Sequence, residues 1–145
     1  MSKKGTYIVL LKSEQSKNIQ IGRLAQLNLQ KGYYLYIGSA LGPGGVLSRL
    51  KHHHRISKKP HWHLDYLRAE TKFYAAYALF SPQRKECEWA ELMAKSEVVI
   101  EPLKGFGSSD CQCDTHLFYF SSSVKMARVI QGVEGILKVD VGLLL

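Results

Sequence analysis

The stretch GYYLYIGS, residues 32–39, is the strongest strand signal in the sequence and decides the fold class. It is rich in aromatic and aliphatic residues, with Gly32 opening it and Gly38 closing it. A second run of this kind, GTYIVLLK at residues 5–12, is short and apolar enough for a strand buried on both faces. These two runs predict the centre of a β-sheet.

Outward from these runs, the apolar pattern predicts further elements that mix strands and helices. Strands are expected at residues 71–80 and 116–120, and helices at residues 46–56, 61–68, 82–95 and from the serines at 121–123 to about residue 132. Polar stretches at residues 13–18, 57–60 and 105–114 favour turns or loops, residues 19–21 alternate, and residues 22–31 predict no element. The expected fold class is therefore α/β-mixed (α+β), with a mainly antiparallel central sheet flanked by helices.

Two helices have further local signals. In the helix at residues 46–56, Leu47, Leu50 and the stem of His54 share one face, which is expected to pack inward. The helix at residues 82–95 has Ser81 as its expected N-cap and Pro82 at its first position.

Length and composition limit the classes of function. The 145 residues fit one domain, 1–145, and the net charge of +8 favours a polyanion, with nucleic acid ahead of an anionic membrane surface. The longest apolar run is far short of the roughly 20 residues that a spanning helix needs. The first residues show no signal-peptide pattern, and three cysteines fit a reducing compartment, so a cytoplasmic location is expected.

The residues with chemical potential follow the two strands in order. Tyr7 lies in the first strand, Tyr36 in the second, and the next helix carries Arg49 and His53, four residues apart on one helix face. This ordered set resembles the GIY-YIG nuclease superfamily and is similar to its small stand-alone Uri-type endonucleases, a family long classed as a domain of unknown function. The resemblance extends from Gly5 to about Phe120 and implies a metal-dependent endonuclease that cuts DNA, with Tyr7, Tyr36, Arg49 and His53 around the scissile phosphate.

Physical chemistry agrees with these roles. A tyrosine hydroxyl can relay a proton when a nearby cation lowers its pKa, and the planar fork of arginine grips two phosphate oxygens. A single carboxylate suits one Mg²⁺ or Mn²⁺ ion that keeps most of its waters.

The resemblance also implies a metal-binding glutamate, and two glutamates have the family's spacing. Glu86 and Glu91 are five residues apart, about 140° around a helix, so only one of them can point into a single site. Glu91 shares a face with Cys87, Ala90 and Ala94, small residues that allow close approach to a sheet. We therefore expect Glu91 to bind the metal, with Glu86 as the alternative.

Three features depart from the family pattern. The first triplet is Gly-Thr-Tyr without the usual isoleucine, residues 42–45 lengthen the loop before Arg49, and no asparagine is evident after the metal glutamate. The alternative function is therefore a non-catalytic nucleic-acid-binding module that retains the fold.

A basic stretch follows the helix arginine. Its cations and two nearby histidines are candidate contacts to DNA phosphates: Lys51, Arg55, Lys58, Lys59, His61 and His63. One of the two histidines is also a candidate proton relay. An ordinary solvated face is the competing interpretation.

A structural zinc site is a further possibility. Its candidate ligands are Cys87, Cys111, Cys113 and His116, although the one-residue spacing between the last two cysteines is tighter than usual. The sequence leaves open the oligomeric state and whether the apolar tail at residues 139–145 completes the core or meets a partner.

Overall fold

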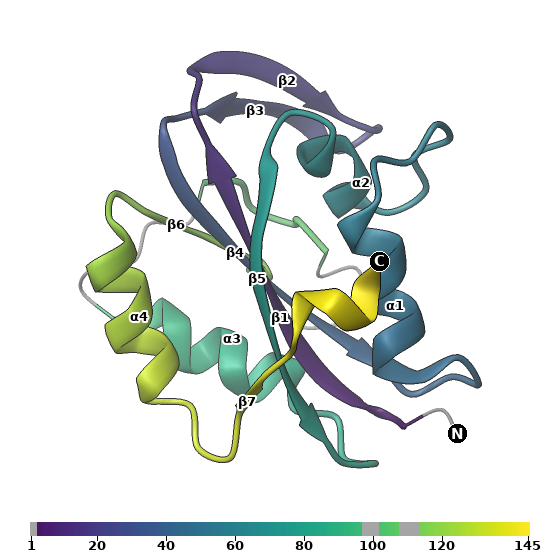
Figure 1. The fold of residues 1–145 in the computed structure, drawn as a ribbon. Helices are drawn as coiled ribbons and strands as arrows, with labels where there is room; N and C mark the ends of the chain where they lie inside the picture. The colour runs from purple at the N-terminus through teal and green to yellow at the C-terminus, as the bar shows by residue number, and fades with distance from the viewer. Residues whose placement is uncertain (1–2, 97–101, 108–113) are drawn as a thin grey trace.

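The central sheet has five antiparallel strands in the order β6-β4-β1-β5-β7, so β1 lies in the middle (Figure 1). The computed structural model describes residues 3–96, 102–107 and 114–145. The strands of this sheet are β1 (Gly5–Ser13), β4 (Gly32–Ala40), β5 (Lys72–Phe80), β6 (Leu117–Phe120) and β7 (Leu137–Lys138). The expected fold class and the four expected strands are confirmed.

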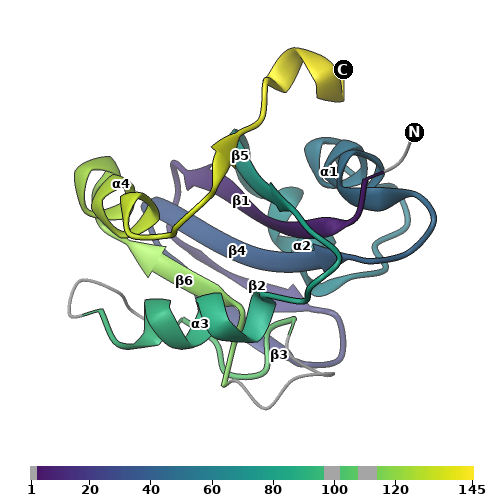
Figure 2. The same ribbon diagram turned by 90° about the horizontal axis from the view of Figure 1, so that it is seen from below.

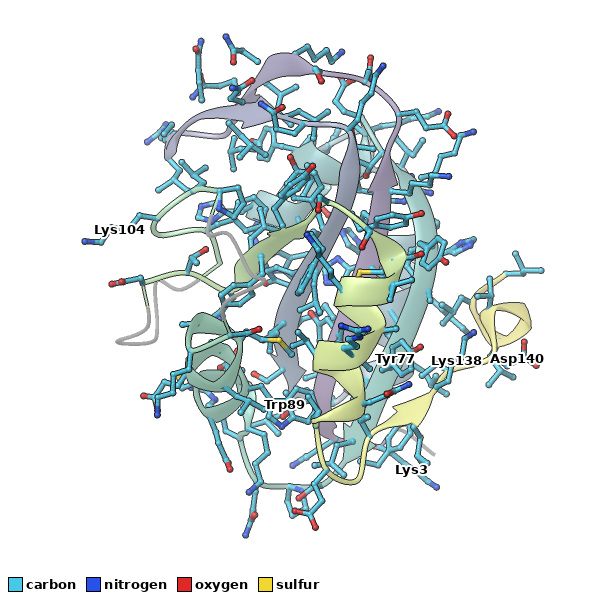
Figure 3. All side chains as sticks on the ribbon, turned by 90° about the vertical axis from the view of Figure 1, so that its left-hand side faces the viewer. Lys3, Tyr77, Trp89, Lys104, Lys138 and Asp140 are labelled. Atoms are coloured by element: carbon cyan, nitrogen blue, oxygen red, sulfur yellow. The ribbon has the colours of Figure 1, made fainter. Side chains whose placement is uncertain are left out.

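The two faces of the sheet are covered by different helices. Helices α1 (Gly45–His54) and α2 (His63–Arg68) cover one face, and α3 (Glu86–Ala94) and α4 (Ser123–Gln131) cover the other (Figures 1 and 2). Side chains of β1 alternate between them: Tyr7 and Val9 pack toward α1, whereas Ile8 packs toward α3. Trp89, a residue of α3, belongs to the core beneath α3 and α4 (Figure 3). A strand buried on both faces therefore carries apolar residues at every position.

A hairpin occupies the region where the sequence predicted a turn and no defined element. Strands β2 (Lys17–Ile21) and β3 (Ala25–Leu29) pair antiparallel as a separate two-stranded sheet. Each strand alternates exposed and buried positions, and its inward aliphatic side chains join the core below α2. The expected turn at residues 13–18 is therefore too long, since β2 begins at Lys17.

Helix α3 begins later than the sequence predicts. Ser81 is not its N-cap, because the backbone N–H of Ser81 bonds to Lys4 O and keeps this segment beside β1. The N–H of Lys85 then donates to Thr6 Oγ1 at 3.1 Å, and the helix starts at the next residue, Glu86. The positive N-terminal end of the α3 dipole therefore lies beside the sheet, and Glu86 is in the first turn of the helix.

Helix α1 is rotated relative to the expected apolar stripe. Its buried residues include Val46, Leu50 and His53, whereas Leu47 is exposed. The helix also ends at His54, two residues early, where Arg68 Nη2 donates to His54 O at 2.9 Å. This rotation places His53 inside the core.

The apolar tail is part of the core in this structure. Val139 and Leu144 are buried, the latter in the short helix η1 (Val141–Leu144) that packs against α1. Leu143 and Leu145 are exposed. Within the described residues, every helix is too short or too polar to cross a bilayer.

Candidate active site

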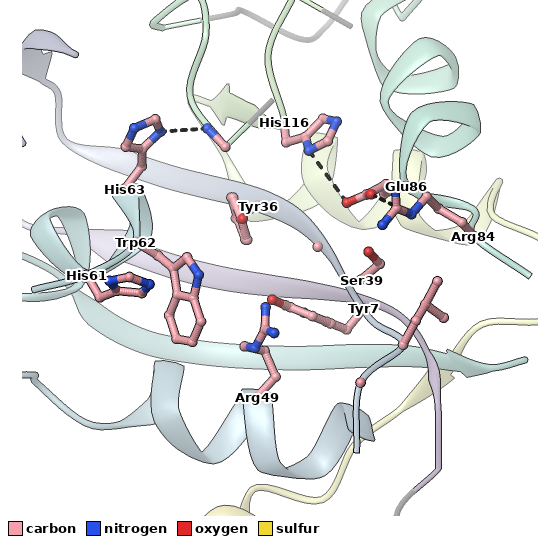
Figure 4. Close-up of a pocket in the computed structure, with 14 residues that line it drawn as sticks. Tyr7, Tyr36, Ser39, Arg49, His61, Trp62, His63, Arg84, Glu86 and His116 are labelled. Atoms are coloured by element: carbon pink, nitrogen blue, oxygen red, sulfur yellow. Dashed lines mark hydrogen bonds and ion pairs between the residues drawn. The ribbon is translucent and has the colours of Figure 1, made fainter. Parts of the chain in front are cut away.

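A cavity of about 460 Å³ lies where α1, the start of α2 and the segment before α3 approach strands β1 and β4 (Figure 4). Its chemically active lining comes from six separate parts of the chain. These residues are Tyr7, Tyr36, Ser39, Arg49, His61, Trp62, His63, Arg84, Glu86 and His116. The structure thus brings together Tyr7, Tyr36 and Arg49, as the sequence predicts.

The sheet register sets the two tyrosines beside each other. Tyr7 pairs with Gly38 across β1 and β4, and Tyr36 lies two residues away on the same face. Their ring centroids are 6.4 Å apart. A Cβ atom at Gly38 would lie 2.4 Å from the Tyr7 ring, so only glycine leaves room for this tyrosine.

His53 supports Tyr7 from behind instead of facing the cavity. Its Nε2 lies 2.8 Å from the Tyr7 hydroxyl, and its ring is only 1% exposed. Burial lowers the pKa of His53 to about 3, and the nearby His52 adds to this shift, so the ring is neutral at pH 7. Arg49 lines the cavity and His53 does not, so the expectation that both address one phosphate is wrong. The cause is the rotation of α1.

The tyrosine hydroxyls hold their protons in this structure. Burial raises the pKa of Tyr7 well above its usual range, and the neighbouring Tyr36 adds to this effect. The Arg49 guanidinium opposes the shift without overcoming it. Burial likewise raises the pKa of Tyr36 to about 12. Neither phenol is therefore a phenolate at neutral pH, contrary to a simple picture in which a cation lowers its pKa.

Gly107 lies against the Tyr36 ring in the lining of the cavity. Gly107 has φ +67°, and a Cβ atom there would lie 2.7 Å from the Tyr36 ring. Its backbone N–H donates to His63 Nδ1 at 2.8 Å. Since Nδ1 accepts this bond and burial lowers the pKa of His63, the neutral ring carries its proton on Nε2.

Arg49 is held by an aromatic ring that the sequence did not identify as part of the site. Its guanidinium carbon lies 4.4 Å from the centroid of Trp62, a cation–π contact. Trp62 is the N-cap of α2, and its backbone N–H donates to Asp65 Oδ2 at 3.0 Å. Asp65 Oδ1 in turn bonds His52 Nε2 at 2.9 Å, which ties the start of α2 to α1.

The glutamate in the cavity is Glu86 and not Glu91. The buried face of α3 consists of Glu86, Trp89, Ala90 and Met93, spaced as one helical stripe. Glu91 is exposed and lies in a different groove, beside Lys85 and Lys95. The choice of Glu91 by its small neighbours is therefore wrong, since the large Trp89 fixes the inward face.

Glu86 has one oxygen held and one directed toward His116. Arg84 Nε contacts Oε1 at 3.2 Å, and His116 Nδ1 lies 3.9 Å from Oε2 (Figure 4). The His116 ring is 1% exposed, and neither of its nitrogens makes a hydrogen bond of standard geometry among the described residues. Burial lowers the pKa of His116, and Glu86 and the backbone of Gly107 oppose this shift. Its backbone is fixed on both sides, since its N–H donates to Phe106 O and its carbonyl accepts from Ile37 N.

The basic stretch is exposed but lies outside the cavity. Lys51, in the last turn of α1, and Arg55, Lys58 and Lys59, beyond its end, are all exposed. Of the six candidate phosphate contacts, only the two histidines, His61 and His63, line the cavity itself.

Among the described residues, one group could hold a metal ion by its donor atoms alone, and it is His52, His53 and Asp65. Its donor atoms lie within 4.8 Å of one another, although the bond between His52 and Asp65 already uses two of them.

The predicted zinc set finds no support in the described residues. Cys87 is not a free thiol, His116 faces Glu86 in the cavity, and Cys111 and Cys113 lie outside the described residues.

Arg84, Trp62 and the role of His116 in the cavity were missed by sequence reasoning. Arg84 precedes Glu86 by two residues, a spacing that suits a charged pair outside a helix, but the expected helix start at residue 82 concealed it. For Trp62 the sequence shows only a polar cluster containing an aromatic residue, without a specific signal.

The fold and cavity define an α+β domain with tyrosines, an arginine and a carboxylate gathered on one concave site. The chain belongs to the family described as domain of unknown function DUF123, whose model matches residues 6–138. Searches of the curated proteins and of the solved structures found no match.

Proposed function

We propose that this protein is a metal-dependent endonuclease of the GIY-YIG type that hydrolyses phosphodiester bonds in DNA. One observation carries the proposal: Tyr7, Tyr36, Arg49 and Glu86, from four different elements, line the same cavity. The ordered motif in the sequence and the excess of positive charge support it.

Arg49 is the proposed phosphate anchor. It carries a permanent charge, and its cation–π contact with Trp62 holds the guanidinium at the cavity. A phosphate bound there gains charge on its oxygens as water attacks phosphorus, and a fixed cation stabilises that charge without reorganising.

Tyr7 and His53 are the proposed proton path. As the water oxygen bonds to phosphorus, the water proton passes to the Tyr7 oxygen and the Tyr7 proton passes to His53 Nε2, 2.8 Å away. The P–O bond to the leaving nucleotide breaks, and that oxygen takes a proton from solvent. Both groups are neutral at rest, and because burial lowers the pKa of His53 to about 3, the imidazolium holds the proton only transiently and loses it once the P–O bond has broken.

Glu86 is the proposed metal residue. Its carboxylate lines the cavity, one oxygen faces away from Arg84, and the cavity volume leaves room for water ligands and a phosphate. A bound Mg²⁺ or Mn²⁺ would supply Lewis-acid stabilisation of the phosphate and acidify a bound water. The donor set therefore fits a single ion with few protein ligands.

The exposed cations in the last turn of α1 and just beyond it are the proposed track for the DNA backbone. Lys51, Arg55, Lys58 and Lys59 continue from the helix that carries Arg49, so a strand anchored at Arg49 could follow them. His61 and His63 would contact DNA at the cavity rim. With DNA as substrate, we also propose a cytoplasmic location.

The test is a cleavage assay on supercoiled, branched and single-stranded DNA with Mg²⁺ or Mn²⁺. We expect divalent-metal-dependent cleavage that falls at least about 10²-fold in Arg49→Ala, the loss typical of one transition-state donor. Arg55→Ala is the matched control, and it should weaken binding at low salt and reduce the salt dependence of binding while retaining turnover. Salt-dependent binding without any turnover would instead identify a non-catalytic nucleic-acid-binding module.

A further inference from the structure

We infer that His116 is a second protein ligand of the ion proposed at Glu86, and that this site prefers a first-row transition ion to Mg²⁺. The inference rests on the proposed function only in taking Glu86 as a metal residue. It is carried by the position and burial of His116 itself.

The buried His116 ring lacks the hydrogen bonds expected of an imidazole. A buried imidazole normally has a partner at one nitrogen at least, because an unpaired polar atom away from water is costly. His116 makes no hydrogen bond of standard geometry at either nitrogen among the described residues, and only Glu86 and the backbone of Gly107 act on the ring against burial, although it is almost completely buried and lines the cavity. A ligand in the cavity would supply the missing partner.

The distance between the His116 ring and the Glu86 carboxylate also suits a shared ion. His116 Nδ1 and Glu86 Oε2 are 3.9 Å apart, too far for a hydrogen bond. Metal bonds to imidazole nitrogen and to carboxylate oxygen are each about 2.1 Å long, so one ion between the two atoms can reach both. The distance thus suits a shared ion better than a direct contact.

The His116 and Glu86 side chains are also held in place by their neighbours. The backbone of His116 is held by Phe106 O and by Ile37 N of strand β4, which fixes where the ring enters the cavity. Arg84 occupies the other oxygen of Glu86 and leaves Oε2 for the ion. Both donor atoms are therefore placed before an ion arrives, as a selective metal site requires.

The donor types determine the preference. Oxygen ligands alone suit Mg²⁺, whereas an imidazole nitrogen favours transition ions. A carboxylate plus one imidazole, with the remaining positions open to water and phosphate, therefore favours an ion such as Mn²⁺ over Mg²⁺.

The experiment uses Mn²⁺ alone with the full chain, by titration calorimetry and pulsed electron paramagnetic resonance. We expect wild-type Mn²⁺ to show magnetic coupling to an imidazole nitrogen. His116→Asn should remove the coupling and weaken Mn²⁺ binding about tenfold, with Mg²⁺ binding changed less than about twofold. His52→Asn, which disrupts the other group of possible metal ligands, should retain the coupling.

A wild-type spectrum without nitrogen coupling overturns the inference even if a His116 variant misfolds, and His116→Gln provides a second replacement for assigning the coupling. Bound Mn²⁺ without nitrogen coupling, in a protein where Glu86→Gln abolishes binding, overturns the inference and leaves the proposed function standing. Coupling that disappears in His52→Asn and persists in His116→Asn overturns it in favour of the other histidines. If Glu86→Gln leaves every bound Mn²⁺ in place, the proposed metal residue falls together with the inference.

Discussion

Two sides of the cavity differ in how completely their polar groups are held (Figure 4). The Arg49 wall consists of Tyr7, Arg49 and Trp62, with His53 directly behind it; the Glu86 wall consists of Arg84, Glu86 and His116. In the Arg49 wall the phenol has a hydrogen bond to His53 and the guanidinium rests on an aromatic ring. In the Glu86 wall, the His116 nitrogens make no hydrogen bond of standard geometry among the described residues, and Glu86 Oε2 lies 3.9 Å from Nδ1.

This difference indicates what each wall binds. In the Arg49 wall the polar groups already have partners and the cation is fixed, which is suited to stabilising a phosphate as negative charge develops on it. The carboxylate of the other wall would repel a phosphate at short range unless a cation lay between them. The Arg49 wall therefore suits the phosphate, and the Glu86 wall suits a metal ion that accompanies it.

Replacing the carboxylate of the Glu86 wall should have the largest effect. We expect Glu86→Gln to lower metal-dependent cleavage about 10³-fold or more, because several kcal/mol of metal stabilisation of the transition state are lost. Initial rates on labelled DNA give the value. Glu91→Gln on the same helix is the matched control and should stay within about twofold; a large loss in that variant instead would exclude Glu86 as the metal residue.

Removing the phenol from the Arg49 wall should have the next largest effect. Tyr7→Phe retains the buried ring and deletes the oxygen bonded to His53, so we expect cleavage to fall about 10²-fold, within the range of general acid–base catalysis. Single-turnover rates separate this loss from binding. Tyr34→Phe, which changes a buried phenol on the same face of the sheet but outside the cavity, is the control. Equal rates in Tyr7→Phe and wild type would remove the proton path from the proposal.

The close approach of Gly38 to Tyr7 predicts a loss of stability. In Gly38→Ala the new methyl group would lie 2.4 Å from the phenol ring, and we expect the free energy of unfolding to fall by about 2 kcal/mol, as for other overpacked sites. Urea denaturation measures the change. Gly42→Ala, at a glycine with open space around it on the same cavity, should leave the stability within about 0.5 kcal/mol. Similar losses in both variants would show that the backbone and not the ring contact is responsible.

Burial of His53 behind the Arg49 wall predicts a dependence of stability on pH. Its pKa is about 3 in the folded chain and about 6.5 when unfolded, so between these values the unfolded state binds the extra proton. The stabilisation is therefore complete above pH 6.5 and decreases by up to about 1.4 kcal/mol for each pH unit below it. The difference between wild type and His53→Gln in urea melts at pH 7, 6 and 5 measures this contribution. A difference independent of pH would mean that His53 is not neutral and buried.

The sequence predicted the Arg49 wall better than the Glu86 wall, for a physical reason. Strands β1 and β4 have dense apolar runs. Tyr36 lies two residues before Gly38 on β4, so it necessarily shares a sheet face with Tyr7, the cross-strand partner of Gly38. Arg49 lies on a helix just beyond β4, so a short connection carries it to the same site. The local sequence pattern was therefore sufficient to predict these residues of the Arg49 wall.

The remaining features depend on tertiary packing. The inward face of α3 is set by Trp89 against the sheet, and the late start of the helix is set by backbone bonds of Ser81 and Lys85 to β1 and its N-terminal flank. The rotation of α1 likewise depends on the residues packed beneath it, which put His53 inside. The hairpin had a visible alternation, but its turn at Gly22 lacks the usual dipeptide signals.

The smallest predicted effect concerns the ring under Arg49. A cation–π contact at a half-exposed site is worth about 0.5–1 kcal/mol, so we expect Trp62→Leu to weaken DNA binding about threefold with little change in the single-turnover rate at saturation. Trp62→Phe retains an aromatic face and should bind more like wild type, as measured by fluorescence anisotropy with labelled DNA. If leucine and phenylalanine weaken binding equally, shape and not the π face positions the guanidinium. If instead the rate falls while binding is retained, Trp62 orients Arg49 for the transition state alone, and the Arg49 wall is more specialised for catalysis than for holding DNA.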